Sequence, residues 1–337
     1  MLNIQSPATD PDLDGEVRFM TSGHTALPIA WFRTHDQLDR EVRMVLGTEY
    51  RKPECIISFA PSHHLYGHIF SKHLPRTHSI PVVEAWRDML SVPELPPEKH
   101  VLIVATPGCW RIVREMSRHT DPAHWKLLHS GGFLPMEARS VVESITRKGA
   151  EVLEILGSTE TGGVATRKAC TDSENPWHLL GDVDLIGAEP GGHTLLSVTS
   201  PRLGRREDMK TAPVCWTLPD LIDVLSDGRH FHYIGRESRF VKVDGRRCSL
   251  DAIESRIRSL PSIQDAVCIA RFSKVRGEHY DVFFVARDAG TMKEDLNAII
   301  INACKGLPLP RVTKRVETIP HNSLGKVLFS EMAERDV

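Results

Sequence analysis

Three short segments of the chain combine glycine or proline with hydroxyl, acidic or basic side chains, the groups that bind phosphate and Mg²⁺ in proteins. They are "GSTETGG" at residues 157–163, "LPDL" at 218–221 and "PHNSLGK" at 320–326. The first follows the apolar run "EVLEIL". Thr159 and Glu160 are therefore expected at the carboxyl end of a strand, where open α/β sheets bind ligands. Taken alone, this segment also fits a polar turn that closes a strand.

In this order and spacing, the three segments resemble the signature of adenylate-forming enzymes, the superfamily of acyl-CoA synthetases, nonribosomal adenylation domains and luciferases. The resemblance runs from about residue 18 to residue 330. It implies that ATP and Mg²⁺ activate a carboxylic acid as acyl-AMP, and that a phosphopantetheine thiol then takes the acyl group. By this resemblance Thr159 binds the α-phosphate and Glu160 holds Mg²⁺. Lys326 bridges the carboxylate and the α-phosphate, where a positive charge stabilises the transition state.

The segment "FMTSGHTALPIAW" at residues 19–31 resembles the phosphate loop of this superfamily. Its matching positions include Thr21, Ser22, Gly23 and Thr25. Three positions depart from the pattern by replacing a hydroxyl residue, a glycine and a lysine: His24, Ala26 and Ile29. Because the lysine would face the β- and γ-phosphates, its absence removes a point charge from the pyrophosphate. Slow adenylation is the expected consequence.

Two further segments resemble the walls of the nucleotide and acyl pockets. In "LLHSGGFLP" at 127–135 the resemblance assigns Gly132, Phe133 and Leu134 to the nucleotide, and Ser130 and Gly131 to the acid. Around the first motif it assigns Leu156, Gly157 and Ser158 to the nucleotide, and Gly163 and Val164 to the acid; Leu156 stands where an aromatic residue usually stacks on adenine. "APSHHLYGHIF" at 60–70 would place His64 at the mouth of the acyl pocket. A surface or core histidine is the alternative for His64.

The resemblance also predicts a ribose site and a hinge. Asp220 would accept both ribose hydroxyls, and Arg236 would reach the ribose and begin the hinge. Ser238 stands at the position about which the domains rotate, and a small polar residue tolerates large dihedral changes there. Lys242 and Arg247 would serve the thioester-forming orientation. Alternatively these residues form surface ion pairs, typically worth under about 1 kcal/mol.

The elements that must position these residues change character along the chain. Between residues 50 and 160, Val/Ile/Leu-rich runs alternate with helical patterns, which indicates buried parallel strands in an α/β sheet. The expected strands span 55–61, 101–107, 125–132 and 151–158, and the expected helices span 110–119 and 137–149, the latter capped by Gly149. From 180 to 235, short strands such as 193–200 and 229–236 indicate a small antiparallel subdomain.

After residue 236 the pattern predicts a small, mobile α+β domain. Its expected elements are a hairpin arm at 240–245, helices at 249–260 and 293–306, and strands at 265–272, 280–287 and 311–319. Ser249 has the position of an N-cap. The predicted organisation is a flexible N-terminus over 1–16, a large adenylate-forming domain over 17–236 that lacks the usual N-terminal subdomain, and a small domain over 237–337 carrying Lys326.

Composition excludes several classes of partner. The chain is 41% hydrophobic and 26% charged with a net charge of -2, so electrostatics favour neither nucleic acid nor an anionic membrane. No apolar run approaches the roughly 20 residues of a membrane-spanning helix. Seven scattered cysteines predict a reduced, cytoplasmic protein. The histidine cluster at 61–70 has no carboxylate or cysteine partner at ligand spacing, which argues against a metal site there.

The oligomeric state, the acid, its acceptor and the enzymatic activity itself each have more than one interpretation. Only 20 residues precede Thr21, fewer than adenylate-forming enzymes usually have, and the exposed sheet edges that would follow predict a homodimer. Short ligases of this kind resemble those of aryl-polyene and xanthomonadin-type pigment pathways, which load an aromatic acid onto an acyl carrier protein; free CoA is the alternative acceptor. An amino-acid substrate is disfavoured because Ala60 replaces the amine-binding Asp. The alternative to an acid–thiol ligase is a nucleotide-binding pseudoenzyme with a regulatory or scaffold role.

Overall fold

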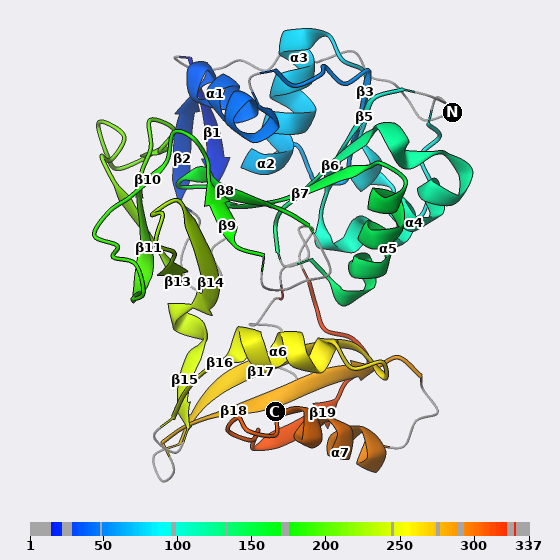
Figure 1. The fold of residues 1–337 in the computed structure, drawn as a ribbon, viewed down its shortest axis with the longest axis vertical. Coiled ribbons are helices and arrows are strands. Elements are labelled where there is room, and N and C mark those ends of the chain that lie inside the picture. The colour runs from blue at the N-terminus through cyan, green and yellow to red at the C-terminus, as the bar shows by residue number, and fades with distance from the viewer. Residues whose placement is uncertain are drawn as a thin grey trace.

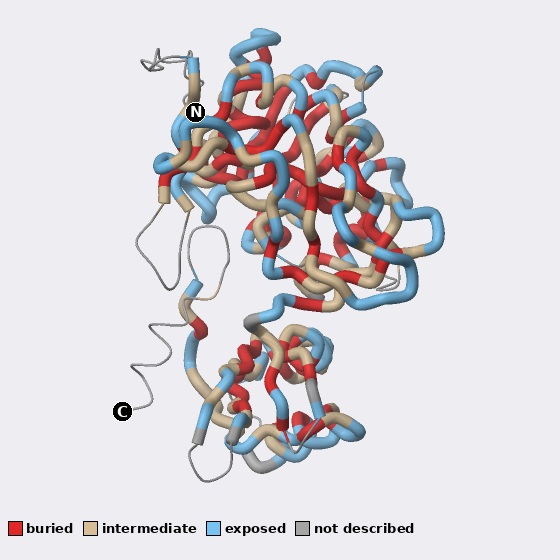
Figure 2. Tube along the Cα trace, turned by 90° about the vertical axis from the view of Figure 1, so that its left-hand side faces the viewer, coloured by how far each residue is buried: buried red, intermediate tan, exposed pale blue. Residues whose placement is uncertain are grey.

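The structure is a computed structural model that describes residues 15–21, 29–47, 49–95, 99–132, 134–169, 175–243, 246–273, 277–288, 293–321 and 327. In the described part, the chain forms a large and a small body (Figure 1). The apolar cores of the large body take their buried residues from Phe19 to Phe231, and those of the small body from Val241 to Ile319. The buried residues lie in separate groups on either side of a thin connection (Figure 2). A domain boundary at residue 236 remains a proposal.

Half of the main sheet is parallel, as the sequence predicts. Its strands are β3 (Cys55–Ser58), β4 (Val82–Val83), β5 (Val101–Ala105), β6 (Trp125–His129) and β7 (Glu151–Ser158), in the order β4-β3-β5-β6-β7. Neighbouring residues on one strand enter opposite cores: Ile56 packs in one core and Ile57 in the other. Both faces of these strands are therefore covered, which explains their unbroken apolar runs.

Helices cover the two faces of this parallel half. On one face lie α1 (His35–Leu46), α2 (Leu65–His68), a π-helix (Ile69–His73) and α3 (Leu74–His78); on the other lie α4 (Trp110–His119) and α5 (Met136–Arg147). Short 3-10 turns span Ala85–Arg87, Pro107–Cys109 and Pro122–His124. The helix predicted at 110–119 has those bounds. Gly149, just beyond α5, has φ 104°, which confirms its role at the helix end.

The antiparallel strands continue the same sheet instead of forming one of their own. They are β8 (Gly162–Lys168), β9 (Trp177–Leu179), β10 (Asp184–Leu185), β11 (His193–Thr199), β13 (Trp216–Val224) and β14 (His230–Arg236). The order β10-β11-β13-β14-β9-β8-β7 makes eleven strands with the parallel half. The antiparallel pairing of β7 with β8 joins the two halves, and the turn between these two strands is the "GSTETGG" segment.

A second, three-stranded sheet carries the predicted phosphate loop. It consists of β1 (Glu16–Met20), β2 (Ala30–Thr34) and β12 (Arg205–Arg206) in the order β1-β2-β12. β1 begins at Glu16, one residue inside the stretch predicted to be a flexible N-terminus, whose residues 1–14 lie outside the described ranges. Thr34 ends β2 and caps α1 in a reciprocal capping box with Gln37.

The small body is α+β, as predicted. Its elements are β15 (Phe240–Val243), β16 (Arg246–Ser249), α6 (Leu250–Arg258), β17 (Ile263–Ser273), β18 (Gly277–Ala286), α7 (Lys293–Ala303) and β19 (Val312–Arg315). β15 pairs with β16, and the second sheet has the order β17-β18-β19. The Ser249 hydroxyl accepts a hydrogen bond from Ala252 N at 3.3 Å, which confirms the predicted N-cap. In the described part of the chain, no helix has the length and apolar character to cross a bilayer.

Candidate active site

The carboxyl edge of the parallel strands brings two predicted pocket segments together. Ser130 follows β6; its backbone N donates to Ala105 O at 3.3 Å and its hydroxyl to Ile155 O at 3.1 Å. The Tyr66 hydroxyl of α2 donates to Ala105 O at 3.2 Å and to Leu128 O at 2.6 Å. Tyr66 therefore ties the histidine-containing segment to the ends of β5 and β6.

His64 is the N-cap residue of α2, two positions before Tyr66, and its ring lies 4.2 Å from the ring of His63. Gly131 has φ 92°, a conformation that favours glycine, and a Cβ on Gly132 would lie 3.2 Å from Pro107 Cγ. The structure thus places His64, Ser130, Gly131 and Gly132 at one edge of the sheet. Their contacts with an acid or a nucleotide stay predictions.

The turn between β7 and β8 presents Thr159 and Glu160, both partly exposed, at its tip. The Ser158 hydroxyl accepts a hydrogen bond from Thr161 N at 3.2 Å and lies 3.1 Å from the Thr161 hydroxyl. Glu160 O accepts from Gly204 N at 2.9 Å. These bonds hold the turn in place, and the Thr159 hydroxyl and the Glu160 carboxylate are the side-chain groups that it offers to a ligand.

Two glycines of the motif are required by the local geometry of the turn. A Cβ on Gly157 would lie 2.1 Å from Gly162 O, where the pairing of β7 and β8 shifts register. Gly162 has φ 71°, and a Cβ there would lie 2.2 Å from Glu41 Oε2. These glycines therefore shape the turn, whatever ligand it binds.

Gly157→Ala is expected to destabilise the protein by at least roughly 3 kcal/mol, because the clash is with backbone and no side chain can move aside. Urea unfolding measures the loss. Gly108→Ala is the matched control, since its added Cβ would meet only Met89 Cε at 3.9 Å. Equal unfolding midpoints for the two variants would contradict the requirement at residue 157.

Asp220 lies on β13 with a 5% exposed side chain and two partners. It accepts a hydrogen bond from the Tyr233 hydroxyl at 3.0 Å, and Arg236 Nε lies 3.4 Å from the same oxygen, Oδ1. Burial, followed by the negative charge of Asp220, raises the pKa of Tyr233, so its hydroxyl keeps its proton and remains a donor. The two residues predicted to hold the ribose are thus adjacent, and Tyr233 joins them.

The predicted hinge lies in the chain directly after β14. Arg236 ends β14 and donates its backbone N to Asp251 Oδ2 at 3.3 Å, and Arg239 Nε donates to Asp251 Oδ1 at 2.9 Å. Ser238 lies in the 3-10 turn Glu237–Arg239 between the two bodies. Lys242 is exposed on β15, opposite Arg247 of β16. Asp251, near the start of α6, therefore fastens the small body at the hinge.

Several predicted residues lie outside the described ranges: Ser22, Gly23, Thr25, Phe133 and Lys326. The residues flanking two of these segments are described. Thr21 N donates to Ile29 O at 2.9 Å, and Ile29 N donates to the Thr21 hydroxyl at 3.1 Å, so residues 22–28 connect two paired positions. His321 and Val327 form an antiparallel bridge across residues 322–326.

Three apolar residues of the predicted pockets contribute to packing. Leu156 and Leu134 are partly buried against the two cores of the large body, and Val164 is fully buried in one of them. Gly163 is buried beside Val164 in β8. Contacts of these residues with a nucleotide or an acid remain predictions.

Sequence reasoning missed the residues that support the site from behind: Tyr66, Tyr233, Arg33 and Arg202. Tyr66 lies inside the "HHLYG" segment, so the sequence could have placed it near the predicted acyl pocket. For Arg33 and Arg202 no such signal exists, because arginine side chains are normally exposed.

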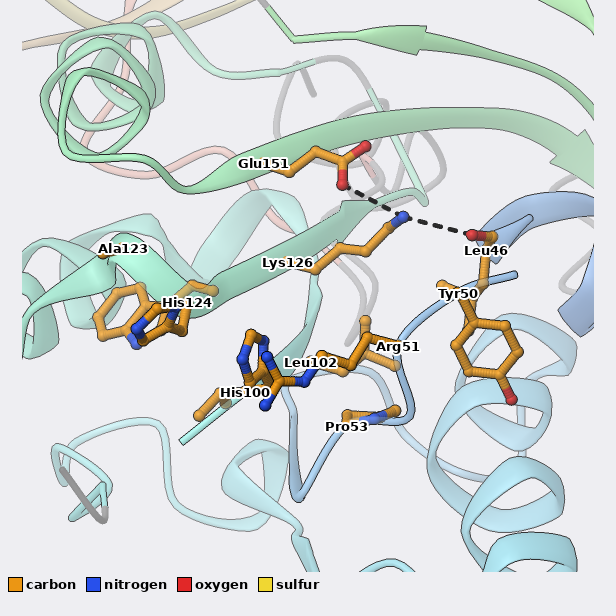
Figure 3. A pocket seen from close by; sticks show the side chains of 12 residues that line it. Leu46, Tyr50, Arg51, Pro53, His100, Leu102, Ala123, His124, Lys126 and Glu151 are labelled. Atoms are coloured by element: carbon orange, nitrogen blue, oxygen red, sulfur yellow. Dashed lines mark hydrogen bonds and ion pairs between the residues drawn. The ribbon is translucent and has the colours of Figure 1, made fainter. Parts of the chain in front are cut away.

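A cavity of about 320 Å³ lies away from all these residues, at the amino ends of β5, β6 and β7 (Figure 3). Its lining includes Tyr50, Arg51, His100 and His124. Lys126 extends between Glu151 Oε2, at 3.2 Å, and Leu46 O, at 3.5 Å, so the wall satisfies this charge internally. The motif residues follow the opposite ends of the strands, so this cavity is not their binding site. Among the described residues, no three His, Cys, Asp or Glu side chains gather as for a metal ion.

No family model matches the chain, but comparisons of its sequence and of its fold with known proteins both find CoA ligases. It is 23% identical to the 4-coumarate–CoA ligase of Halorhodospira halophila over 323 residues, 92% of this chain and 74% of that protein. Its fold is similar to the anthranilate CoA ligase AuaEII in complex with anthranoyl-AMP, with a TM-score of 0.75 and 15% identity over 94% of this chain and 66% of that one. It is also similar to the O-succinylbenzoate coenzyme A synthetase of Bacillus subtilis in complex with ATP and a magnesium ion (TM-score 0.69, 17% identity, 94% and 69% coverage).

The chain spans 66% to 74% of the length of these three proteins. The solved structures share its fold, and the sequence similarity extends over nearly all of it. In sequence and in fold, the chain is therefore similar to CoA ligases over nearly all of its length.

Proposed function

We propose that this chain is an AMP-forming acid–thiol ligase. The observation that supports it best is the anchored turn between β7 and β8, which presents the Thr159 hydroxyl and the Glu160 carboxylate where the strand ends. Mg²⁺ is usually held by one or two carboxylates together with substrate phosphates, so one partly exposed carboxylate beside a hydroxyl suits MgATP. Asp220, with Arg236 and Tyr233, would hold the ribose.

The proposed reaction has two steps. First, a carboxylate oxygen of the acid bonds to the α-phosphorus of ATP, the bond from that phosphorus to the bridging oxygen breaks, and pyrophosphate leaves. Then a thiolate sulfur bonds to the acyl carbon and AMP leaves. Glu160 would hold Mg²⁺ at the phosphates, and Lys326 would balance the charge that builds between the two anions. Lys242 would act in the second step.

The acid we propose is aromatic, and the acceptor is a phosphopantetheine thiol. The similar proteins named above support an aromatic or arylalkenoic acid, since they act on 4-coumarate and anthranilate. Their names also point to CoA as acceptor. An acyl carrier protein presents the same thiol, so both acceptors belong in the test.

The test is hydroxylamine trapping with ATP, Mg²⁺ and a panel of benzoates, cinnamates and fatty acids. Hydroxamate from an aromatic acid, followed by thioester formation with CoA or a holo carrier protein, is the expected result. If none of the acids yields hydroxamate although the protein measurably binds MgATP, a nucleotide-binding pseudoenzyme would be favoured instead.

Tyr233→Phe is expected to raise the KM for ATP by about tenfold, because a hydrogen bond to a charged group is worth about 1.5–3 kcal/mol. The variant leaves the buried Asp220 carboxylate with one donor fewer. Tyr50→Phe is the control: its hydroxyl lies 3.4 Å from His78 Nε2, and Tyr50 lines the cavity at the other edge of the sheet. Initial rates at varied ATP measure both. An unchanged KM in Tyr233→Phe would remove Asp220 from the ribose site.

A further inference from the structure

Two fully buried arginines lie directly behind the turn that presents Thr159 and Glu160. Arg33 of β2 and Arg202, in the loop before β12, are both 0% exposed. Arg33 Nη2 donates to Thr159 O at 2.9 Å, and its Nη1 donates to Arg202 O. Arg202 Nη2 donates to Gly163 O at 2.8 Å. The two guanidinium groups thus hold carbonyl groups on both sides of the tip of the turn.

Two buried carboxylates complete this network. Glu41 of α1 accepts from Gly163 N at 2.7 Å and from Arg202 Nη1 at 3.2 Å. Asp182 accepts from Arg202 Nη2 and Nε, both at 2.9 Å. Arg40 Nε also pairs with Asp182 Oδ2 at 2.8 Å, so three guanidinium groups share these two carboxylates, and the charge of Glu160 also acts on Arg33.

Such a network is a costly way to fill a protein interior. Burying one ion costs several kcal/mol after relaxation, and apolar side chains of similar size often pack there without loss of stability. Arginine instead offers a planar fork that fixes the direction of its partners. Burial lowers the pKa of Arg33 to about 10, with Glu41 opposing this effect, so the group is still charged at neutral pH. Its Nη1 and Nη2 groups donate to the backbone of Arg202 and of the turn, whereas Nε has no hydrogen-bond partner among the described residues.

We propose that Arg33 is a positioning residue for MgATP. Arg33 holds Thr159 O directly. It also holds Arg202 O, in the same loop as Gly204, whose N–H binds Glu160 O. Through these bonds it sets where the Thr159 hydroxyl and the Glu160 carboxylate meet the phosphates and Mg²⁺. The inference rests on the proposed function. It goes beyond that function because Arg33 itself has no exposed surface and touches no substrate.

Three variants test it: Arg33→Met, which loses the charge and the donors, Arg33→Lys, which keeps the charge, and Arg167→Met as control. Arg167 makes a bidentate pair with Glu154 in the same β7–β8 hairpin, at 2.8 and 3.1 Å, away from the turn. For each we would measure Tm, MgATP binding by titration calorimetry, and hydroxamate formation against Mg²⁺ and acid concentration.

Arg33→Met should lower kcat and raise the Mg²⁺ concentration for half-maximal activity. The ratio of kcat to that Mg²⁺ concentration should fall by about 10- to 100-fold, since a misplacement of about 1 Å has effects of this size. The KM for the acid should stay unchanged. Arg33→Lys should recover part of the loss, and Arg167→Met should change Tm alone. If Arg33→Met does not fold, Arg33→Lys decides by the same measurements.

The outcomes separate this inference from the proposed function. Wild-type Mg²⁺ dependence and MgATP affinity in a folded Arg33 variant would overturn the positioning role while leaving the ligase activity standing. If the wild type binds MgATP but forms no hydroxamate, the proposed function fails, and the loss of MgATP affinity in the Arg33 variants still tests the positioning role. A wild type that does not bind MgATP would overturn both.

Discussion

Replacing Lys326 by alanine is expected to slow acyl-adenylate formation by roughly 100- to 1,000-fold, the loss typical of removing one preorganised electrostatic group from an active site. The carboxylate and the α-phosphate repel each other as they approach, and the ammonium group would lower the energy of that encounter. ATP–pyrophosphate exchange measures this step directly. Thioester formation from a supplied acyl-adenylate should stay close to the wild-type rate, because pyrophosphate release is already complete.

Lys305→Ala is the matched control for this prediction. Lys305 is an exposed lysine of the same small body, just beyond α7. Its variant should behave as the wild type in both half-reactions. Normal exchange in Lys326→Ala would show that this lysine does not serve the first step, and the proposed mechanism would have to be abandoned.

Replacing Glu160 by glutamine is expected to reduce hydroxamate formation roughly 100-fold at low Mg²⁺, because the metal stabilises charge on the phosphates by several kcal/mol and its protein ligand loses its charge. Part of the activity should return as the Mg²⁺ concentration rises. A Mg²⁺ titration of initial rates, with the acid saturating, measures the effect.

Glu151→Gln is the control, since Glu151 is the first residue of β7, the strand that leads to the Glu160 turn, and it pairs with Lys126 beside the cavity at the opposite edge of the sheet. Both variants replace one β7-region carboxylate by an amide, so a general effect of lost charge would appear in both. Equal Mg²⁺ requirements in Glu160→Gln and the wild type would exclude Glu160 as a metal ligand.

Local patterns were sufficient for most of the elements. The apolar runs at β3, β5, β6 and β7 predicted parallel strands because both faces of such strands are covered and every position can be apolar. Capping residues marked helix ends for a similar reason: Ser249 and Gly149 act through bonds or dihedral angles within a few residues of themselves.

Long-range pairing could not be predicted in the same way. The antiparallel strands were expected in a subdomain of their own, yet they extend the main sheet through the β7–β8 hairpin. The hairpin of β1 and β2 was not anticipated either, since its strands flank a segment noted only for its glycine and hydroxyls. Which strands pair depends on contacts between distant parts of the chain, and short-range periodicity does not contain that information.

For the candidate site, the sequence by itself determined the chemical groups: the hydroxyl and carboxylate of Thr159 and Glu160, the acid Asp220, and a lysine near the end. Only the tertiary structure decided what holds them. Tyr233 reaches Asp220 from a neighbouring strand, and Arg33 reaches Thr159 across 126 positions of sequence. Such supporting contacts depend on which side chains the fold brings together in a buried space, where an unpaired polar group is costly. That cost exists only once the chain has folded.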